Sequence, residues 1–389
     1  MSASQTQRTI CHISTVHTTF DQRIFHRECC STHLAGFDTH LIIEADQDQT
    51  VDGVHIHAVD APPAERVGMH VSRRIQRLRK ANRIAKQIKA DIYHLHDPEL
   101  ISLGLWLKRT TKAKVIFDCH ENNVGYIKQK SHLPKALSRF VLIPLMGTAE
   151  RLAARNLDAI ITADRGVFDI FEQQYKAKRT VLLHNFPRLD LFLHDGVDQP
   201  NDWPEVDLVY HGTIPKYHLE VAFEIAEILK RRGRSVKWLF FGVPSAREAW
   251  WTEELERRQL TDNFIIDPHR IPHQEVAPRV KKSKLGFIPL PDLPKFQSNI
   301  PTKLFEFMAL KMPTVLSDLP PSRPFVGDGK AAIMVPPHDY EAYANAIEKL
   351  LDDPELCKQM GEHGHQEVVE NYNWEVESQR LIDLYDSLV

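Results

Sequence analysis

The amino-acid sequence predicts an α/β protein made of two Rossmann-like domains with a cleft between them. Short apolar runs alternate with amphipathic helical patterns, which is typical of parallel sheets covered by helices. The alternation stops at one polar, proline-containing stretch and then resumes. A chain of 389 residues also exceeds the size of one common hydrophobic core, so two domains are expected.

The first domain is expected to span residues 1–190. Apolar runs predict strands at Thr9–Val16, Asp38–Glu44, Val54–Val59, Ile92–His96, Val115–Cys119, Ala159–Thr162 and Val181–His184. Apolar residues at helical spacing predict helices at Gln22–Leu34, Val71–Lys89, Leu100–Arg109, Pro134–Asn156 and Gly166–Gln174.

The stretch Phe186–Glu205 is polar and contains Pro187, Pro200 and Pro204, so it is interpreted as an interdomain linker. The second domain is expected to span residues 191–374. Its predicted strands are Leu208–His211, Val236–Phe241, Phe264–Ile266, Leu285–Leu290 and Thr314–Leu316. Its predicted helices are His218–Arg231, Glu248–Gln259, His273–Lys281, the helix opened by Pro301, Tyr340–Leu351 and the helical stretch from Pro354. The last part, about 375–389, is expected to pack back on the first domain.

Composition narrows the class of protein. The cysteines are five in number and form no CxxC pair, which argues for a reducing compartment and against a disulfide framework or a zinc cluster. Met1–Arg8 lacks the apolar core of a signal peptide, and the longest apolar run, Phe140–Met146, is too short to span a bilayer. These features predict a soluble cytoplasmic protein.

Charge is unevenly distributed, with a basic excess in residues 1–190 and an acidic excess in the remainder. One segment is crowded with basic residues: Arg66, Arg73, Arg74, Arg77, Arg79, Lys80, Arg83, Lys86 and Lys89. A second basic group precedes Phe140–Ile143 and consists of Lys128, Lys130, Lys135 and Arg139. Such stretches suit either a solvated helix face or peripheral contact with the anionic cytoplasmic face of a membrane. Nucleic acid is not expected as a partner, because the net charge is −3 and no aromatic residues interleave the basic ones.

The most informative stretch is Ser298–Ala309. Pro301 suits the first position of a helix, where backbone N–H groups are unpaired and carry partial positive charge. Lys303 and Glu306 are three residues apart and can share one helix face. A cation, a carboxylate and free N–H groups suit a nucleoside diphosphate, which offers phosphates and ribose hydroxyls. A surface helix with an ordinary ion pair is the alternative.

Loops after predicted strands supply further candidates, because ligands bind at the carboxyl ends of parallel strands. His17 follows the first strand, and Arg23 in the next helical turn opposes the helix dipole unless an anion or carboxylate compensates it; a ligand contact and a plain surface charge both fit. His120 could bond a sugar hydroxyl, act as an acid or base, or be structural. Gly212 permits close backbone approach, and Lys216 could reach a phosphate; an ordinary turn is the alternative.

Several other site types are not expected. His94 and His96 share a strand face as metal ligands could, but no clear third ligand lies at a useful spacing. The Asp46-Gln47-Asp48 pattern is short and far from the strongest site, so we set it aside. No GxGxxG follows the first strand and no GxSxG occurs, which argues against a dinucleotide cofactor and a serine hydrolase.

Taken in order, these pieces resemble the retaining GT4 family of GT-B-fold glycosyltransferases. Tyr210-His211-Gly212-Thr213 with Lys216 is similar to the family's glycine loop, and Pro301 to Val315 is similar to its P-x-K-x-x-E-Y-M-A-x-G-x-P-V-V signature. The run from Ala332 to Pro337 and on to Leu351 also matches. In the first half the likeness is looser and rests on Asp21 with Arg23, His94–Asp97 and Asp118–Glu121.

The resemblance implies roles by position. Glu306 would be the second glutamate of the family's E-x7-E and would hold the ribose hydroxyls, while the first, which contacts the donor sugar, is Ser298 here. Lys216 and Lys303 would neutralise the diphosphate, and Thr213 stands where many members have arginine. His120 would lie near the donor sugar or the acceptor. The candidate catalytic residues are His120, Lys216 and Lys303. The candidate substrate-binding residues are His17, Arg23, Gly212, Thr213, Arg270, Ile271, Ser298, Asn299, Pro301, Thr302 and Glu306.

The implied activity is transfer of a hexosyl-type sugar, with retention of configuration, from a nucleotide sugar to a glycan or lipid-linked acceptor in surface polysaccharide biosynthesis. No metal or other cofactor is expected. Two alternatives remain: a nucleotide-sugar epimerase or hydrolase on the same fold, and a non-catalytic nucleotide-sugar-binding protein. The altered Ser298 and Thr213 keep the second alternative open, whereas an epimerase or hydrolase would need acidic residues around the sugar, where Ser298 supplies none.

Overall fold

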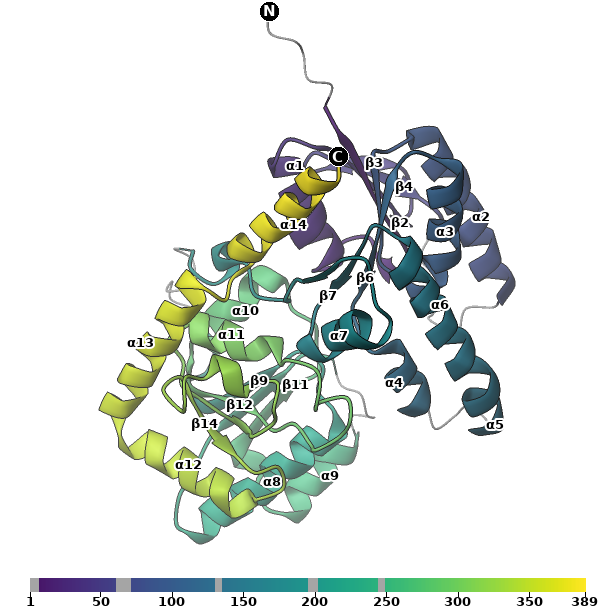
Figure 1. The fold of residues 1–389 in the computed structure, drawn as a ribbon. Coiled ribbons are helices and arrows are strands. Elements are labelled where there is room, and N and C mark those ends of the chain that lie inside the picture. The colour runs from purple at the N-terminus through teal and green to yellow at the C-terminus, as the bar shows by residue number, and fades with distance from the viewer. Residues whose placement is uncertain (1–6, 61–70, 130–134, 195–201, 244–248) are drawn as a thin grey trace, which may run out of the picture. The chain divides into compact units, whose positions relative to one another are not determined.

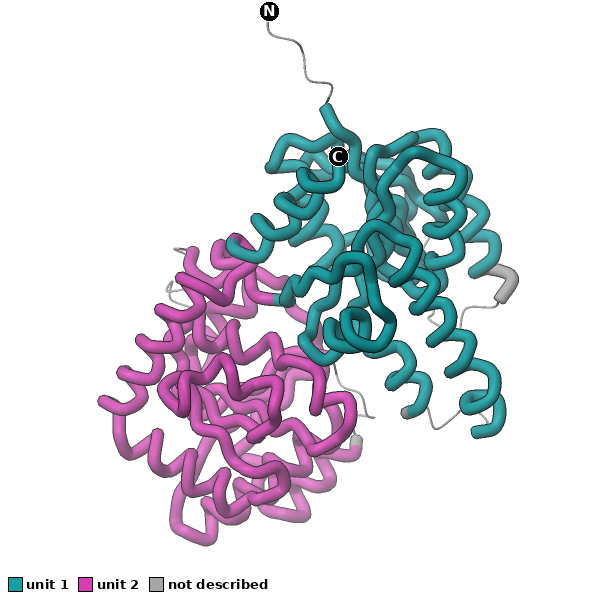
Figure 2. Tube along the Cα trace, viewed as in Figure 1, with its two compact units in different colours: residues 1–185, 376–389 teal, residues 186–375 magenta. Residues whose placement is uncertain are grey.

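The structure is a computed structural model that describes residues 7–60, 71–129, 135–194, 202–243 and 249–389. The chain divides into two compact units: unit 1 comprises residues 1–185 and 376–389, and unit 2 comprises residues 186–375 (Figure 2). Each unit is built on its own sheet, as the alternating pattern predicts (Figure 1). The C-terminal residues 376–389 therefore belong to the same unit as the N-terminal strands.

The sheet of unit 1 has eight strands in the order β3-β4-β2-β1-β5-β6-β7-β8. All neighbouring strands run parallel except β3 and β4. The strands are β1 (Thr9–Thr18), β2 (Asp38–Glu44), β3 (Gln49–Val51), β4 (Val54–Ala58), β5 (Ile92–Leu95), β6 (Lys114–Cys119), β7 (Ala159–Thr162) and β8 (Thr180–Leu182).

Helices cover both faces of this sheet. The α-helices are α1 (Cys30–Leu34), α2 (Val71–Ile88), α3 (Ile101–Thr110), α4 (Asn123–Gln129), α5 (Lys135–Leu137), α6 (Ile143–Asn156), α7 (Arg165–Asp169) and α14 (Trp374–Leu388). The 3₁₀ and π segments are η1 (Ile24–Cys29), η2 (Pro98–Leu100), η3 (Ser138–Leu142) and η4 (Ile170–Gln174). Ile42 of β2 joins the core formed with α2, α3 and α6, whereas Leu41 and Ile43 join the core formed with η1. Successive strand residues point to opposite faces, so both faces are buried.

Unit 2 holds six parallel strands in the order β11-β10-β9-β12-β13-β14. The strands are β9 (Val206–His211), β10 (Trp238–Phe241), β11 (Phe264–Asp267), β12 (Ser283–Ile288), β13 (Thr314–Ser317) and β14 (Ala332–Val335). The α-helices are α8 (Lys216–Arg231), α9 (Ala249–Arg257), α10 (His273–Val280), α11 (Thr302–Ala309), α12 (Tyr340–Asp352) and α13 (Pro354–Glu370). The 3₁₀ turns among the described residues of this unit include η5 (Leu189–Leu191), η7 (Thr261–Asn263) and η8 (Arg323–Phe325). Leu208 and Val209, adjacent in β9, enter different cores on the two faces.

The strand and helix predictions are confirmed with three omissions: β3, β14 and α4 were not predicted. The β3–β4 hairpin turns at Asp52 and Gly53, whose φ values are 48° and 77°. This Asp-Gly pair is the short turn that a tight hairpin requires, so the sequence did contain its signal.

The predicted linker is wrong at its beginning. Phe186 is buried in unit 2, where its ring centroid lies 4.5 Å from that of Phe305 in α11. An aromatic side chain in the core contributes to packing, so Phe186–Leu193 belongs to unit 2 and only part of the proline-containing stretch can act as a connection. Residues 195–201 lie outside the described residues.

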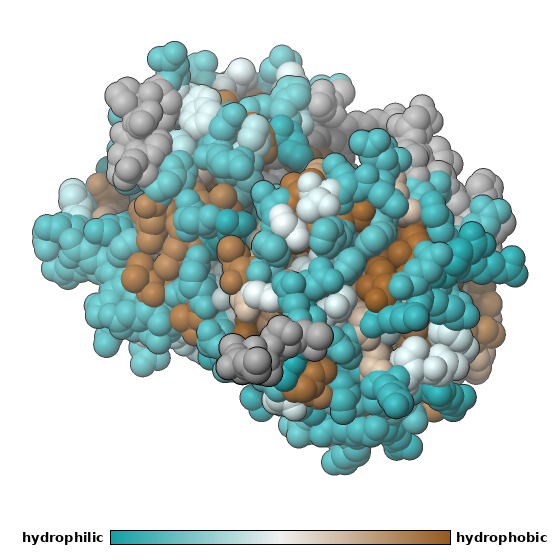
Figure 3. All heavy atoms as spheres, turned by 90° about the horizontal axis from the view of Figure 1, so that it is seen from above, coloured by the Kyte–Doolittle hydropathy of each residue, from teal (hydrophilic) through white to brown (hydrophobic). Residues whose placement is uncertain are grey.

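The surface is mostly hydrophilic, with separate hydrophobic patches on the face drawn in Figure 3. Within the part of the chain that the structure describes, no helix is both long and apolar enough to cross a membrane.

Candidate functional site

Unit 2 contains a pocket of about 260 Å³ at the carboxyl ends of β9 and β10 and the start of α11. Seven predicted site residues line it: Gly212, Thr213, Arg270, Ile271, Thr302, Lys303 and Glu306. Six further lining residues were not predicted as site residues: His211, Phe241, Gly242, Val243, His273 and Val276. Gly242 follows an apolar strand just as Gly212 does, and that repeated pattern was the signal that could have identified the second loop.

Helix α11 begins one residue later than predicted. Pro301 has φ −73° but ψ 105°, so it is extended, and Thr302 is the first helical residue. The Pro301 carbonyl accepts a hydrogen bond from the Leu304 N–H at 3.0 Å, and no side chain caps this end of the helix. The uncapped N-terminus is positively polarised and opens beside the pocket through Thr302 and Lys303.

Glu306 and His211 form the polar centre of the pocket. Glu306 Oε2 lies 3.0 Å from His211 Nε2, yet neither atom has a hydrogen-bond partner of good geometry among the described residues. Burial raises the pKa of Glu306, but the nearby His211 and Lys303 outweigh it and lower this pKa to about 2. The carboxylate is therefore ionised at neutral pH and has acceptor capacity to spare for ligand hydroxyls.

Lys303 lies under the β9 loop. Its Nζ is 5.1 Å from the ring centroid of Tyr210, and burial lowers the pKa of its ammonium while Glu306 opposes that shift. A Cβ atom added to Gly212 would meet Lys303 Nζ at 3.2 Å, so the glycine leaves room for the lysine.

The two glycine loops are held against each other. Gly212 has φ +96° and Gly242 has φ +133°, values that L side chains rarely adopt. Val243 N–H donates to the Gly212 carbonyl at 3.0 Å, and a Cβ on Gly242 would lie only 1.9 Å from that oxygen. The arrangement brings backbone close to the pocket, as phosphate binding requires.

Four predicted residues of unit 2 do not line this pocket: Lys216, Ser298, Asn299 and Pro301. Lys216 Nζ lies 4.5 Å from the Trp250 ring centroid and 3.5 Å from Glu220 Oε1. Because half of the Lys216 side chain is exposed, its role at a phosphate stays a prediction. Ser298 Oγ donates to neighbouring loop oxygens.

In unit 1 the predicted residues His17, Arg23 and His120 gather around Asp118. His120 Nε2 lies 3.1 Å from Asp118 Oδ2, and the rings of His17 and His120 are 5.3 Å apart. Hydrogen bonding to Asp21 and the charge of Asp97 raise the pKa of His17 despite its burial. Both histidines are partly exposed, so both can meet a ligand.

Arg23 is not a surface charge, and that alternative is wrong. Its guanidinium is buried and binds both carboxylate oxygens of Asp118, at 2.8 and 3.1 Å. It also donates to the Leu183 carbonyl and the Asn185 side chain, at 3.1 and 2.7 Å. The carboxylate offsets the unfavourable helix position, and a ligand contact of Arg23 stays a prediction.

The basic segment also differs in part from a fully solvated face. Arg74, Arg79, Lys80, Arg83 and Lys86 are exposed on α2, and Lys89 is exposed directly after it. Arg77 instead is buried, with hydrogen bonds to Glu44 at 2.8 Å and to the Thr15 carbonyl at 3.0 Å. Arg66, Lys130 and the side chain of Arg73 lie outside the described residues.

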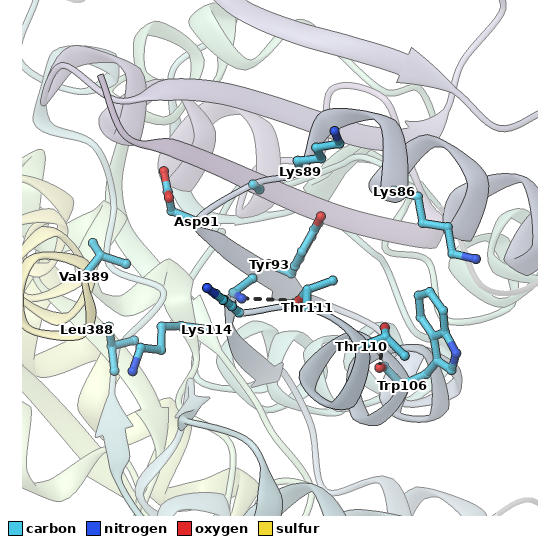
Figure 4. A pocket seen from close by; sticks show the side chains of 13 residues that line it. Lys86, Lys89, Asp91, Tyr93, Trp106, Thr110, Thr111, Lys114, Leu388 and Val389 are labelled. Atoms are coloured by element: carbon cyan, nitrogen blue, oxygen red, sulfur yellow. Dashed lines mark hydrogen bonds between the residues drawn. The ribbon is translucent and has the colours of Figure 1, made fainter. Parts of the chain in front are cut away.

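A larger pocket of about 680 Å³ lies in unit 1 near the starts of β5 and β6 (Figure 4). Lysines and Tyr93 with Trp106 surround it, and Leu388 and Val389 close one side. None of the predicted site residues lines this pocket, which lies at the amino ends of the strands and not at the ligand-binding carboxyl ends.

Comparison with known proteins assigns the chain to a family of glycosyltransferases. Residues 205–353 match the family model described as glycosyl transferases group 1, and residues 25–185 match the glycosyl transferase 4-like domain. An alpha-D-kanosaminyltransferase from Streptomyces kanamyceticus is 28% identical over 174 residues. That match covers 44% of this chain and 41% of the kanosaminyltransferase, so it spans less than half of the relative's length.

Solved structures share the fold over almost the whole chain. A sucrose-phosphate synthase from Thermosynechococcus elongatus has a TM-score of 0.75 at 17% identity, covering 98% of this chain and 99% of that one. Anabaena Alr3699/HepE in complex with UDP-glucose has a TM-score of 0.69 at 12% identity, covering 97% and 99%. The GT-B fold class is confirmed.

Proposed function

We propose that this chain, which belongs to the group 1 (GT4) glycosyltransferases, transfers a hexosyl-type sugar from a nucleotide sugar with retention of configuration. The observation that carries the proposal is the pocket of unit 2. There an ionised glutamate with unused acceptor capacity, a buried lysine and two glycine loops meet the open end of a helix. These groups match a ribose and its diphosphate.

Glu306 would accept hydrogen bonds from the ribose hydroxyls, and His211 would fix the orientation of its carboxylate. Lys303 and the first N–H groups of α11 would stabilise the charge that develops on the departing diphosphate. The backbone near Arg270 and Ile271 would contact the base. The described residues of the pocket include no second carboxylate, so we propose that the leaving phosphate takes the acceptor proton and that transfer needs no metal.

The acceptor is proposed to be a glycan or a lipid-linked glycan in surface polysaccharide biosynthesis. His120 and His17 are the candidates to contact it or the donor sugar, since both combine a partly exposed ring with a carboxylate partner. The kanosaminyltransferase relative supports transfer of a sugar, and the UDP-glucose complex of HepE supports a sugar-nucleotide donor.

Peripheral contact with the cytoplasmic face of a membrane is proposed for the region α4–α6. Phe140 and Leu145 are 72% and 65% exposed, and exposed Lys128, Lys135 and Arg139 lie in the same region. Apolar side chains flanked by cations suit an anionic lipid surface. In a sedimentation assay, the protein should be found in the pellet with vesicles that contain anionic lipid. The double variant Phe140→Ser with Leu145→Ser should remain in the supernatant. Equal binding to neutral vesicles would contradict the assignment.

A panel of nucleotides and nucleotide sugars tests the central proposal. Thermal shift should detect binding of one nucleoside diphosphate, and incubation with its sugar conjugate and an acceptor should give product and free nucleotide. Free sugar without transfer would favour a hydrolase, and binding without turnover under any acceptor would favour the non-catalytic alternative. No stabilisation by any nucleotide would refute the nucleotide site.

A further inference from the structure

Unit 1 contains a second group of side chains that the proposed transfer does not use. His12 on β1, His94 on β5, His96 directly after β5, and Glu28 on η1 form what we call the histidine–glutamate cluster. All four side chains are fully buried. His12 pairs in register with His94, and His96 follows two residues later on the same strand face. Segment η1 lies over this face and contributes Glu28.

Ligand atoms of the cluster converge on one point. Glu28 Oε2 lies 3.9 Å from His12 Nδ1, 3.8 Å from His94 Nδ1 and 3.7 Å from His96 Nε2. His12 Nδ1 and His96 Nε2 are 3.0 Å apart. Neither carboxylate oxygen of Glu28 has a hydrogen-bond partner of good geometry among the described residues, although Oε1 lies 2.9 Å from Arg23 Nε.

A single buried guanidinium serves two acidic side chains beside the cluster. Arg23 lies between Glu28 and Asp118, both fully buried. Buried charges are normally paired or bound to metal. A further positive charge on the other side of Glu28 would satisfy its free oxygen.

We propose that the histidine–glutamate cluster binds one divalent first-row transition metal ion. Imidazole nitrogen and carboxylate oxygen are the ligands that Zn²⁺ and its neighbours prefer. Four such ligands at bond lengths of about 2.0–2.1 Å lie about 3.3 Å from one another in a tetrahedron. Four of the six separations are 3.0–3.9 Å and need shifts of up to about 0.6 Å to reach that value, and all the ligand atoms lie within 4.8 Å of one another.

Outer groups support the same assignment. A histidine ligand normally bonds a carboxylate or another polar group through its second nitrogen. His96 Nδ1 lies 3.6 Å from Asp118 Oδ2, and His12 Nε2 lies 3.4 Å from the Tyr385 hydroxyl. The same hydroxyl is 2.7 Å from His94 Nδ1; on metal binding His94 exchanges this bond for coordination, and the phenol oxygen is available as a further ligand.

The site is closed to solvent, as structural metal sites are. A bound ion would tie β1, β5 and η1 together, with Tyr385 of the C-terminal helix held against them. The sequence alone did not predict it because His94 and His96 supply only two ligands, and the others come from distant segments that the fold brings together.

Metal content of the purified full chain tests the proposal. After growth in medium supplemented with Mn, Fe, Co, Ni, Cu and Zn salts, and removal of any affinity tag, mass spectrometry of the elements should find about one equivalent of one metal. The double variant His12→Gln with His96→Gln should fall below about a tenth of that value. His40→Gln is the matched control, since His40 also pairs with a histidine, His57, at 2.9 Å but lies outside the cluster.

X-ray absorption spectroscopy of the metal-containing wild-type protein tests the same proposal without the variants, so the result does not depend on whether they fold. It should show nitrogen and oxygen neighbours at about 2.0–2.1 Å with the scattering pattern of imidazole. Wild-type protein with less than a tenth of an equivalent of every metal would overturn the proposal. Sulfur neighbours, or equal loss in His40→Gln, would also overturn it.

Discussion

Replacement of Glu306 gives the sharpest test of the nucleotide site. Glu306 is 9% exposed and lines the pocket, and one oxygen of its carboxylate has no hydrogen-bond partner of good geometry among the described residues. Since the pKa of Glu306 is lowered to about 2, its bonds to ribose hydroxyls would be charge-assisted, and each is worth about 1.5–3 kcal/mol. Glu306→Ala should therefore weaken nucleoside diphosphate binding by at least about 2 kcal/mol, or roughly 30-fold.

Isothermal titration calorimetry with a nucleotide and its 2′-deoxy counterpart isolates the contact. Wild-type protein should bind the ribonucleotide more tightly than the 2′-deoxy nucleotide. Glu306→Ala should remove most of this difference in affinity. Glu362→Gln, an exposed substitution in α13, is the control and should leave both affinities unchanged. If Glu306→Ala binds the ribonucleotide as wild type does, or keeps the full preference, Glu306 does not hold the ribose.

The lowered pKa of Glu306 predicts that the folding stability of the protein depends on pH. The folded-state pKa of Glu306 is depressed to about 2, below its unfolded value of about 4.3. Its ionisation therefore stabilises the fold fully above about pH 4.3, and this contribution is lost as the pH falls towards 2. Urea titrations of wild type and Glu306→Gln should show a stability difference that narrows between pH 5 and 3, and a constant difference would contradict the assigned ionisation.

Three further substitutions follow from the geometry. Lys303→Met should lower the affinity for a nucleoside diphosphate about tenfold or more and change the affinity for the nucleoside little. Lys358→Met, at an exposed position of α13, should change neither affinity. Calorimetry with both ligands measures these affinities. Gly212→Ala should lower both the affinity for the diphosphate and the melting temperature, because its Cβ meets Lys303 Nζ at 3.2 Å. Gly233 has φ +79° and no neighbour within 4 Å, so Gly233→Ala should lower only the melting temperature. Arg23→Met should destabilise unit 1 by about 3–5 kcal/mol, since it strands buried carboxylates; a loss below 1 kcal/mol in chemical denaturation would refute that role.

Most strands and helices could be predicted because their cause is local. Strands such as β7 and β10 are buried on both faces, so they read as short, largely apolar runs. The three omissions have different causes: β3 is a three-residue edge strand without an apolar run, α4 shows no marked amphipathic period, and β14 was noticed only as part of a family-like motif. Phe186 was assigned to a linker because its neighbours are polar, although its ring packs on α11.

In the candidate site, too, residues whose role depends on local backbone geometry could be predicted, and residues that depend on distant partners could not. Gly212, Lys303 and Glu306 could be placed in one pocket because glycine after a strand and charges at the start of a helix act through backbone geometry fixed within a few residues. The burial of Arg23 could not be predicted, since its partner Asp118 is 95 residues away. The histidine–glutamate cluster, likewise assembled from three segments, was reduced in the sequence to one histidine pair.

This difference explains why the donor side of a glycosyltransferase is easier to predict than the acceptor side. Phosphates are bound by helix ends and glycine loops, which are contiguous in sequence. In unit 1 two of the predicted side chains depend on residues from other strands, His17 on Asp97 and Arg23 on Asp118. His120 contacts Asp118, which lies two residues before it at the end of β6. Acceptor specificity should therefore respond to substitutions at Asp97 and Asp118 that leave His17 and His120 in place, and donor affinity should respond mainly to the glycine loops and α11.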